Sequence, residues 1–228
     1  MLKFIAVKMG FILSIETATT NCSVSLSREG KLIALKEDYS DKYSHAERLH
    51  VFIQELMVEN NVDKGNLDAI AVSKGPGSYT GLRIGVSAAK GLCYALDIPL
   101  IAVSTLQSLA VQIKENNAFI IPMLDARRME VYSAIYNGSD GMMVRGIKAE
   151  ILNENSYKQY LDSSKVFFIG NGVNKFEEIC YHPNAIFIKE KLPSAKEMTI
   201  MAYTAFNNND FVDVSYFEPY YLKDFVVG

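Results

Sequence analysis

The chain has 228 residues, of which 49% are hydrophobic and 21% are charged. This composition excludes a disordered chain, and the length suits one large domain or two small lobes. Lys and Arg number 23 against 26 Asp and Glu, so the formal net charge is −3. Because a protein that grips a phosphate backbone alone usually carries a basic excess, we expect any role in nucleic-acid biology to run through another subunit.

The three cysteines, Cys22, Cys93 and Cys180, are too few and too widely spaced for a disulfide framework or a metal knuckle. A reducing, cytoplasmic compartment is the simplest interpretation. No apolar run approaches the roughly 18 residues of a membrane helix, so we expect no membrane contact. Lys8 interrupts the apolar start, which argues against a signal peptide. With Met9 as an alternative start, residues 1–8 would be an extension without a role in the fold.

The first half of the chain alternates between strand and helix patterns. Its expected strands cover residues 11–16, 22–27, 31–35, 68–72 and 99–103. Its expected helices cover 44–60, 82–96 and 104–114. Ser44 with Glu47, and Ser104 with Gln107, have the spacing of capping boxes. The first three strands follow one another through short turns and so form an antiparallel meander.

The second half repeats this order. Its expected strands cover residues 118–124, 130–136, 142–150, 166–169 and 185–188, and its helices 157–161, 174–181 and 194–206, with Ser194 as the cap of the last. Both halves therefore follow the order βββαβαβα. This order resembles that of the actin-like (ASKHA) proteins, so we expect an α/β fold of two RNase H-like lobes, 9–115 and 116–228, with the second lobe reduced.

A glycine-rich loop joins an expected strand to the long second helix. It consists of Gly75, Pro76, Gly77, Ser78, Tyr79, Thr80 and Gly81, and Arg83 follows on the helix. Glycines permit close backbone approach, and amides at a helix start form an anion site. The alternative is a tight strand-to-helix turn without a ligand, since the spacing matches neither a P-loop nor a dinucleotide fingerprint.

Charged residues follow the first expected strand of the second half. Asp125 could hold a metal-bound water near a phosphate, and Arg127 with Arg128 could clamp a phosphate or a carboxylate. The alternative is a charged hairpin turn. His45 and His50 stand five residues apart and face different ways on a helix, whereas paired zinc ligands need a spacing of four. We therefore predict no metal site.

Several segments together resemble the TsaB family, also called YeaZ. They are Ile15-Glu-Thr-Ala18, Gly75-Pro-Gly-Ser-Tyr-Thr-Gly-Leu-Arg-Ile-Gly85, Asp125-Ala-Arg-Arg-Met-Glu-Val-Tyr132 and Pro219-Tyr-Tyr-Leu-Lys223. The resemblance extends from Met9 to near the C-terminus, and the second and third strings are long and specific.

The resemblance implies a non-catalytic scaffold or activating subunit in bacterial synthesis of threonylcarbamoyladenosine in tRNA. Such a subunit pairs with a TsaD-type catalytic subunit through helices of the first lobe, and a TsaE-type ATPase joins them. The complex transfers a threonylcarbamoyl group from its adenylate to the adenosine beside the anticodon. In isolation we expect a homodimer. No cofactor is required by this interpretation, and weak or partner-dependent binding of ATP or ADP stays open.

The sequence departs from the catalytic relative at its metal-binding histidines, where Thr105 and Leu109 stand. Leucine cannot ligate a metal and a lone threonine hydroxyl is a poor ligand. We expect a degenerate nucleotide site made of Glu16, Thr17, Asp125, Arg127, Arg128, Gly170 and Gly172. Asp125 and the Gly170–Gly172 turn motivate an alternative function, an independent actin-like ATPase or sugar kinase. A peptidase is a weaker alternative, because the histidine pair is missing.

The expected partner or dimer interface lies on the first two helices of the first lobe. Its residues are Leu49, Phe52, Ile53, Leu56, Leu82, Val86, Ala89 and Lys90. The apolar and small side chains on these helices motivate this choice. We expect Leu56→Arg or Ala89→Arg to abolish pairing and to leave the monomer folded.

Overall fold

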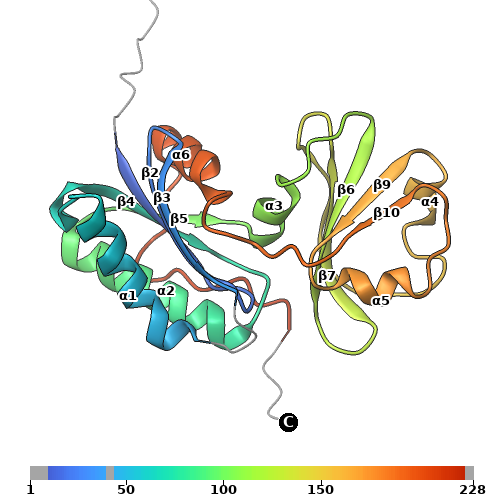
Figure 1. Cartoon of the computed structure of the whole chain (residues 1–228), viewed down its shortest axis with the longest axis horizontal. Helices are drawn as coiled ribbons and strands as arrows, with labels where there is room; N and C mark the ends of the chain where they lie inside the picture. Colours follow the sequence, from blue (N-terminus) through green and yellow to red (C-terminus); the bar gives the residue numbers. More distant parts are fainter. Residues whose placement is uncertain (1–9, 40–43, 224–228) are drawn as a thin grey trace, which may run out of the picture. The chain divides into compact units, whose positions relative to one another are not determined.

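The computed structural model describes residues 10–39 and 44–223, and the chain divides into two compact units (Figure 1). The first unit contains the described residues up to Lys74, together with Thr80–Val103 and Ser194–Pro219. The second contains Gly75–Tyr79, Ser104–Pro193 and the described residues from Tyr220. No helix of the described residues combines the length and the apolar character that a membrane crossing needs.

The first unit is built on a five-stranded sheet. Its strands are β1 (Phe11–Glu16), β2 (Cys22–Arg28), β3 (Lys31–Asp38), β4 (Leu67–Ser73) and β5 (Leu100–Val103), in the order β3-β2-β1-β4-β5. The β1–β2 and β2–β3 pairs are antiparallel, and the β1–β4 and β4–β5 pairs are parallel. The meander expected from the sequence is therefore confirmed, although β3 is three residues longer than expected.

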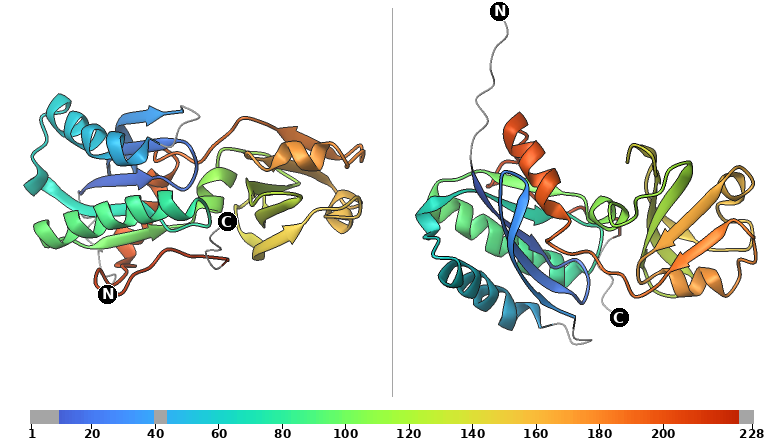
Figure 2. Two further views of the ribbon diagram at one scale, coloured as in Figure 1. Left: turned by 90° about the horizontal axis from the view of Figure 1, so that it is seen from below. Right: turned by 45° about the horizontal axis from the view of Figure 1, so that its top comes forward.

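Three helices cover the two faces of this sheet (Figure 2). They are α1 (His45–Glu59) and α2 (Tyr79–Leu96) on one face and α6 (Met198–Asn208) on the other, and a 3-10 turn, Lys64–Asn66, precedes β4. Leu13 and Ile15 of β1 pack towards α1 and α2, whereas Ile12 packs with α6. This alternation is the period of two of a strand that is buried on both faces.

Serines on β2 hold the segment that leads into α6. Ser23, Ser25 and Ser27 alternate with the apolar residues that face α1, yet all three serines are fully buried. The Oγ of Ser23 accepts a hydrogen bond from Ala195 N at 2.8 Å, and the Oγ of Ser25 donates one to Ala195 O at 2.8 Å. Both polar groups of one buried peptide residue are thus satisfied by side chains rather than by a strand.

The second unit repeats the topology. Its strands are β6 (Ala118–Asp125), β7 (Glu130–Asn137), β8 (Met143–Ile151), β9 (Lys165–Ile169) and β10 (Ala185–Ile188), in the order β10-β9-β6-β7-β8. Its helices are α3 (Thr105–Ala110), α4 (Lys158–Leu161) and α5 (Val173–Glu177). With β6 in the place of β1, the strand order is the same as in the first unit. The duplicated βββαβαβα order and the α/β fold class are therefore confirmed.

Each repeat ends in a helix that belongs to the other compact unit. Helix α3 ends the first repeat but lies in the second unit, and α6 ends the second repeat but lies in the first unit. Leu106 and Leu109 of α3 pack in one cluster with Ile120 of β6, and Met198 and Phe206 of α6 pack with strands of the first sheet. The compact units therefore differ from the expected division at residue 115, because α3 and α6 bury their apolar faces on the sheet of the neighbouring repeat. The expected lobes were two continuous stretches of the chain, and such a division cannot show that α3 and α6 are exchanged between the units.

Two of the three expected caps are wrong. Ser44 precedes α1 but makes no side-chain cap, and its Oγ donates to Asp38 Oδ2 at 2.9 Å instead. Ser194 is not a cap either, because α6 begins only at Met198. Ser104 does cap α3, since its Oγ accepts from Gln107 N at 3.4 Å. Helix α2 begins three residues earlier than expected, and α3 and α5 each end four residues earlier.

Replacing Ser23 by Ala should lower the free energy of unfolding by about 1–3 kcal/mol, because the buried Ala195 N–H loses its acceptor. Ser14→Ala is the matched control, since the Ser14 Oγ is equally buried and has no hydrogen-bond partner among the described residues. Urea unfolding of both variants measures the difference. Equal losses in the two variants would contradict the role given to Ser23.

Candidate functional site

The first turns of α2 pack directly on the turn between β1 and β2. Thr17 Oγ1 donates a hydrogen bond to Gly81 O at 2.8 Å. A Cβ at Gly81 would lie 2.1 Å from Thr17 O, and a Cβ at Gly85 would lie 2.2 Å from Thr17 Oγ1. Any side chain at either position would overlap Thr17, so these two glycines have a packing reason that needs no ligand.

The preceding loop is fastened to the start of α3. Gly75 N donates to Thr105 Oγ1 at 3.1 Å, and Thr105 N donates to Gly75 O at 3.2 Å. The rings of Tyr79 and Tyr221 lie 4.9 Å apart between centroids. Pro76 is buried, Gly77 and Ser78 are half-buried, and Thr80 and Arg83 are exposed. The hydroxyl of Thr105 is thus a loop anchor.

Glu16 ends β1 with no exposed surface. Its Oε1 accepts a hydrogen bond from Ala18 N at 2.7 Å. Burial raises the pKa of the Glu16 carboxyl to about 7, and the Glu197 carboxyl adds to this, against hydrogen bonds from Ala18 and Ser73 that lower it. Desolvation is the dominant cause, since an ionised carboxylate loses its hydration there.

Asp125, Arg127 and Arg128 form the hairpin turn between β6 and β7. Asp125 Oδ1 accepts from Arg127 N at 2.7 Å and from Lys175 Nζ at 2.6 Å. The same ammonium donates to Arg128 O at 2.5 Å and to Glu130 O at 3.1 Å. Both arginines have left-handed backbones and are exposed. The carboxylate thus closes the turn and binds a cation of its own chain, as the charged-hairpin alternative describes.

Gly170 and Gly172 bring the turn after β9 onto the end of β6. Gly170 has a φ of 122°, and a Cβ there would lie 2.3 Å from Met123 O. A Cβ at Gly172 would lie 2.9 Å from Val131 Cγ1. Between them, Asn171 Oδ1 accepts from Asp125 N at 2.9 Å. The structure brings this turn together with Asp125, and close packing within the unit accounts for both glycines.

The residues expected in the nucleotide site are divided between the two units. Glu16 and Thr17 lie with Ser73 and Gly81 in the first unit, and the remaining five lie around the β6–β7 turn in the second. In the described part of the chain, no three His, Cys, Asp or Glu side chains gather as a metal site would require. Leu109, at the second expected histidine position, is fully buried.

The structure corrects the expected interface, because most of its residues belong to the core. Seven of the eight are buried in the first unit, namely Leu49, Phe52, Ile53, Leu56, Leu82, Val86 and Ala89. All but Leu82 pack in one core cluster with β1, β2 and β4. The eighth, Lys90, donates to Ser215 O and Phe217 O, both at 3.1 Å. The apolar stripes face the sheet, so Leu56→Arg or Ala89→Arg would place a charge in the core and unfold the unit.

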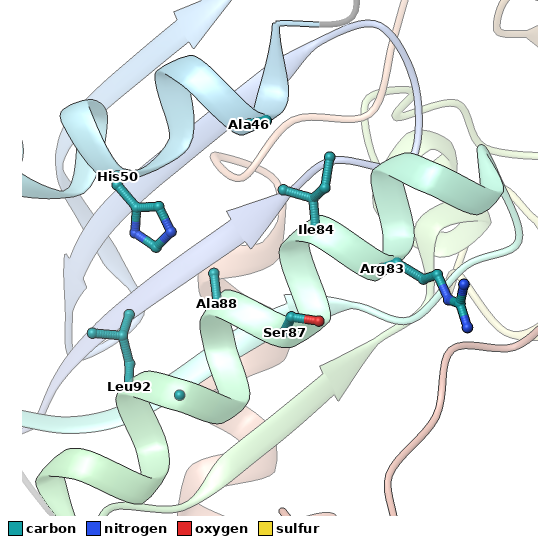
Figure 3. A pocket seen from close by; sticks show the side chains of 8 residues that line it. Ala46, His50, Arg83, Ile84, Ser87, Ala88 and Leu92 are labelled. Atoms are coloured by element: carbon teal, nitrogen blue, oxygen red, sulfur yellow. The ribbon is translucent and has the colours of Figure 1, made fainter.

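A groove runs between α1 and α2 on their outer side (Figure 3). Figure 3 shows Ala46 and His50 on α1 across from Ile84, Ala88 and Leu92 on α2. The groove measures about 590 Å³ and is completed by Arg83, Ser87 and Gly91. A Cβ at Gly91 would meet no atom within 4 Å. The sequence of α2 contains many small residues, and this feature could have indicated the groove.

The two mixed sheets share one strand order, so the chain is an α/β protein built from two units of duplicated topology. A family model described as "TsaD: tRNA N6-adenosine threonylcarbamoyltransferase" matches residues 40–227. The tRNA threonylcarbamoyladenosine biosynthesis protein TsaB of Escherichia coli (strain K12) is 30% identical over 223 residues, covering 93% of this chain and 94% of that protein. The Bacillus subtilis (strain 168) protein of the same name is 39% identical over 132 residues, 58% of this chain and 57% of that protein.

A solved structure, "YeaZ from Pseudomonas aeruginosa", is 30% identical with a TM-score of 0.80, and the match covers 94% of this chain and 100% of that one. The chain therefore belongs to the TsaB (YeaZ) family. The resemblance found in the sequence motifs is thereby confirmed.

Gly85→Ala should lower the free energy of unfolding by about 1–3 kcal/mol through overpacking, because the new methyl meets Thr17 Oγ1. Thr17→Ala removes that oxygen. The double variant should therefore lose less free energy of unfolding than the sum of the losses in the two single variants. A double-mutant cycle by urea unfolding measures this coupling. Strict additivity would show that the Oγ1 contact does not limit the approach of α2.

Glu16→Gln should stabilise the protein at pH 8 and change little at pH 4. The folded-state pKa of about 7 lies above the ordinary glutamate value of 4.5, so wild-type stability falls as the pH rises through this window and the full penalty applies above it. The shift corresponds to at most about 3 kcal/mol. Unfolding curves between pH 4 and 8 test this, and parallel pH profiles for the two proteins would refute the buried charge.

Proposed function

We propose that the chain is the non-catalytic, activating subunit of a complex that forms threonylcarbamoyladenosine in tRNA. In this proposal it pairs with a TsaD-type catalytic subunit, and a TsaE-type ATPase joins the pair. The names of the TsaB relatives support the pathway, and the match to the TsaD family model supports a common ancestry with the catalytic subunit. One observation carries the proposal: two of the candidate ligand-binding groups, Thr17 and Asp125, are engaged within their own units, whereas the outer groove of α1 and α2 is open.

Thr105 and Leu109 support the absence of catalysis. A metal centre at these positions needs two nitrogen or oxygen ligands that are free to turn towards an ion. The Thr105 hydroxyl already accepts the Gly75 N–H, and Leu109 offers only carbon in a fully buried position. A metal-assisted transfer at this place would need both side chains to be replaced.

We infer that the chain requires no cofactor of its own. An incoming phosphate-bound metal would compete with Lys175, whose ammonium already neutralises Asp125 and also binds two carbonyls. On the other unit, Thr17 donates its hydroxyl to Gly81 rather than to a ligand. Weak or partner-dependent binding of ATP or ADP would have to use other donors.

The partner surface in this proposal is the groove between α1 and α2. Ala46, Ser87, Ala88 and Gly91 are short, so another helix can approach the two backbones closely. A helix of the TsaD-type subunit that carries larger apolar side chains would fill the groove. A second copy of this chain would present the same groove, and we expect this homodimer to form when the partner is absent.

Contact with tRNA is indirect in this proposal. The formal charge of −3 gives the chain no basic excess to hold a phosphate backbone. The catalytic partner would therefore supply the tRNA-binding surface, and this chain would act on the rate through the partner's structure.

Gly91→Arg should abolish binding to the cognate TsaD-type subunit and leave the fold intact. The position is exposed and its Cβ has open space, so the long side chain fills the groove instead of the core. Gly65→Arg is the matched control, because Gly65 is also exposed and unobstructed but lies outside the groove. Calorimetric titration measures both affinities, and wild-type binding by Gly91→Arg would overturn the groove assignment.

Reconstitution tests the role itself. Threonylcarbamoyl transfer to tRNA by the TsaD-type and TsaE-type proteins should depend on this chain and should fall to the background rate with Gly91→Arg. Transfer at the full rate without the chain would refute an activating subunit. Steady ATP turnover by the isolated chain that disappears in Asp125→Asn would instead support the alternative of an independent ATPase.

A further inference from the structure

The segment after α6 returns along the first unit as a strap, which we define as residues 211–218. Val212 N donates to Leu100 O at 2.9 Å, so the strap begins at the β5 edge of the sheet. Val214 and Phe217 then pack against the core cluster that contains α1 and α2. The dark red trace in Figure 2 follows α6 and belongs to this segment. The strap is therefore a folded part of the unit.

A tight turn in the strap is fixed from two sides. Asp213 Oδ1 accepts from Ser215 N at 2.7 Å and from Tyr216 N at 3.1 Å, and Asp213 O accepts from Phe217 N at 2.8 Å. On the other side, the Lys90 ammonium of α2 donates to Ser215 O and Phe217 O. Five hydrogen bonds thus hold the backbone immediately around Tyr216.

The side chain at the centre of this turn is left in solvent. Tyr216 is 85% exposed, although the backbone on both sides of it is bonded. A large aromatic group on a rigid backbone loses little conformational freedom when a partner covers it, and tyrosine is among the residues that dominate binding energy at protein interfaces. The turn therefore has the features of an anchor that is organised before binding.

This anchor is continuous with the groove through α2. Lys90, which binds the strap, is followed four residues later by Tyr94, which is 87% exposed and lies on the same flank of the helix. Gly91, next to Lys90, lines the groove. The outer surface of the first unit thus passes from the groove over the Tyr94 flank of α2 to the strap.

Charge decides what kind of partner the strap fits. Residues 209–219 include Asp210, Asp213 and Glu218 and contain no Lys or Arg. This acidic segment would repel a phosphate backbone. It suits a protein surface with an apolar socket for the ring and basic side chains at the rim.

Resting on the function proposed above, we infer that Tyr216 is an anchor for the TsaD-type partner, held in place by Lys90 and Asp213. The partner then contacts two connected surfaces, the groove and the strap. The exposed ring of Tyr216 inserts into an apolar socket on the partner. Lys90 is a positioning residue in this arrangement, because it acts through the strap backbone.

Binding of full-length variants to the cognate TsaD-type subunit tests the anchor. Tyr216→Ala should lower the affinity by about tenfold or more, with an unchanged melting temperature because the side chain is exposed. Tyr216→Phe, which keeps the ring, should lose much less. Tyr181→Ala is the matched control, since Tyr181 is 89% exposed in the second unit. Lys90→Met should weaken binding and speed hydrogen exchange at the amides of residues 215–217.

The outcomes separate the anchor from the proposed function. Wild-type affinity of Tyr216→Ala, together with lost binding in Gly91→Arg, would overturn the anchor and leave the groove in place. Weakened binding by Tyr216→Ala with wild-type binding by Gly91→Arg would support the anchor and refute the groove. If neither variant changes the affinity, both are refuted, and an equal loss in Tyr181→Ala would also overturn the anchor.

Discussion

The contact between α2 and the β1–β2 turn determines how the first unit presents its surfaces. Only glycine at positions 81 and 85 lets the helix rest on Thr17. Once the helix is placed there, its apolar side fills the core, its outer side forms one wall of the groove, and its Lys90 flank holds the strap. The close approach of α2 to Thr17 thus orients three faces of one helix, towards the core, the groove and the strap.

The two units use their polar groups in the same manner. Thr17 in one unit and Asp125 in the other stand where the sequence suggested ligand binding. Thr17 instead bonds the first turn of α2, and Asp125 closes the β6–β7 turn. A charge or hydroxyl with a satisfied partner gains little from binding a ligand, since it must first lose that partner. This chemistry favours a protein that acts through its surface over one that acts through a reaction centre.

Much of the fold could be predicted from the sequence, because strand and helix periods are local signals and the βββαβαβα order repeats. The exchange of α3 and α6 could not, since an amphipathic helix does not specify which sheet covers its apolar face. The serines of β2 are fully buried, and two of them bond Ala195, a contact between distant segments that strand periodicity does not reveal. Ser44 makes no cap because its side chain turns towards Asp38, six residues earlier in the chain, and a spacing rule does not include that contact. The candidate interface failed for a related reason, because Leu49 and Leu56 were chosen by hydrophobicity, which marks the core.

A partner surface on a small α/β unit is better recognised by residues that the unit itself does not require. Glycine within a helix costs about 1 kcal/mol relative to alanine, and in contrast to Gly81 and Gly85, no packing contact in the described structure accounts for Gly91. An exposed tyrosine on a turn held by five hydrogen bonds is equally without use to the isolated unit. A helix seated against Gly91 and a socket closed over Tyr216 would give both residues a physical purpose, and the same partner can supply the two because both residues border Lys90.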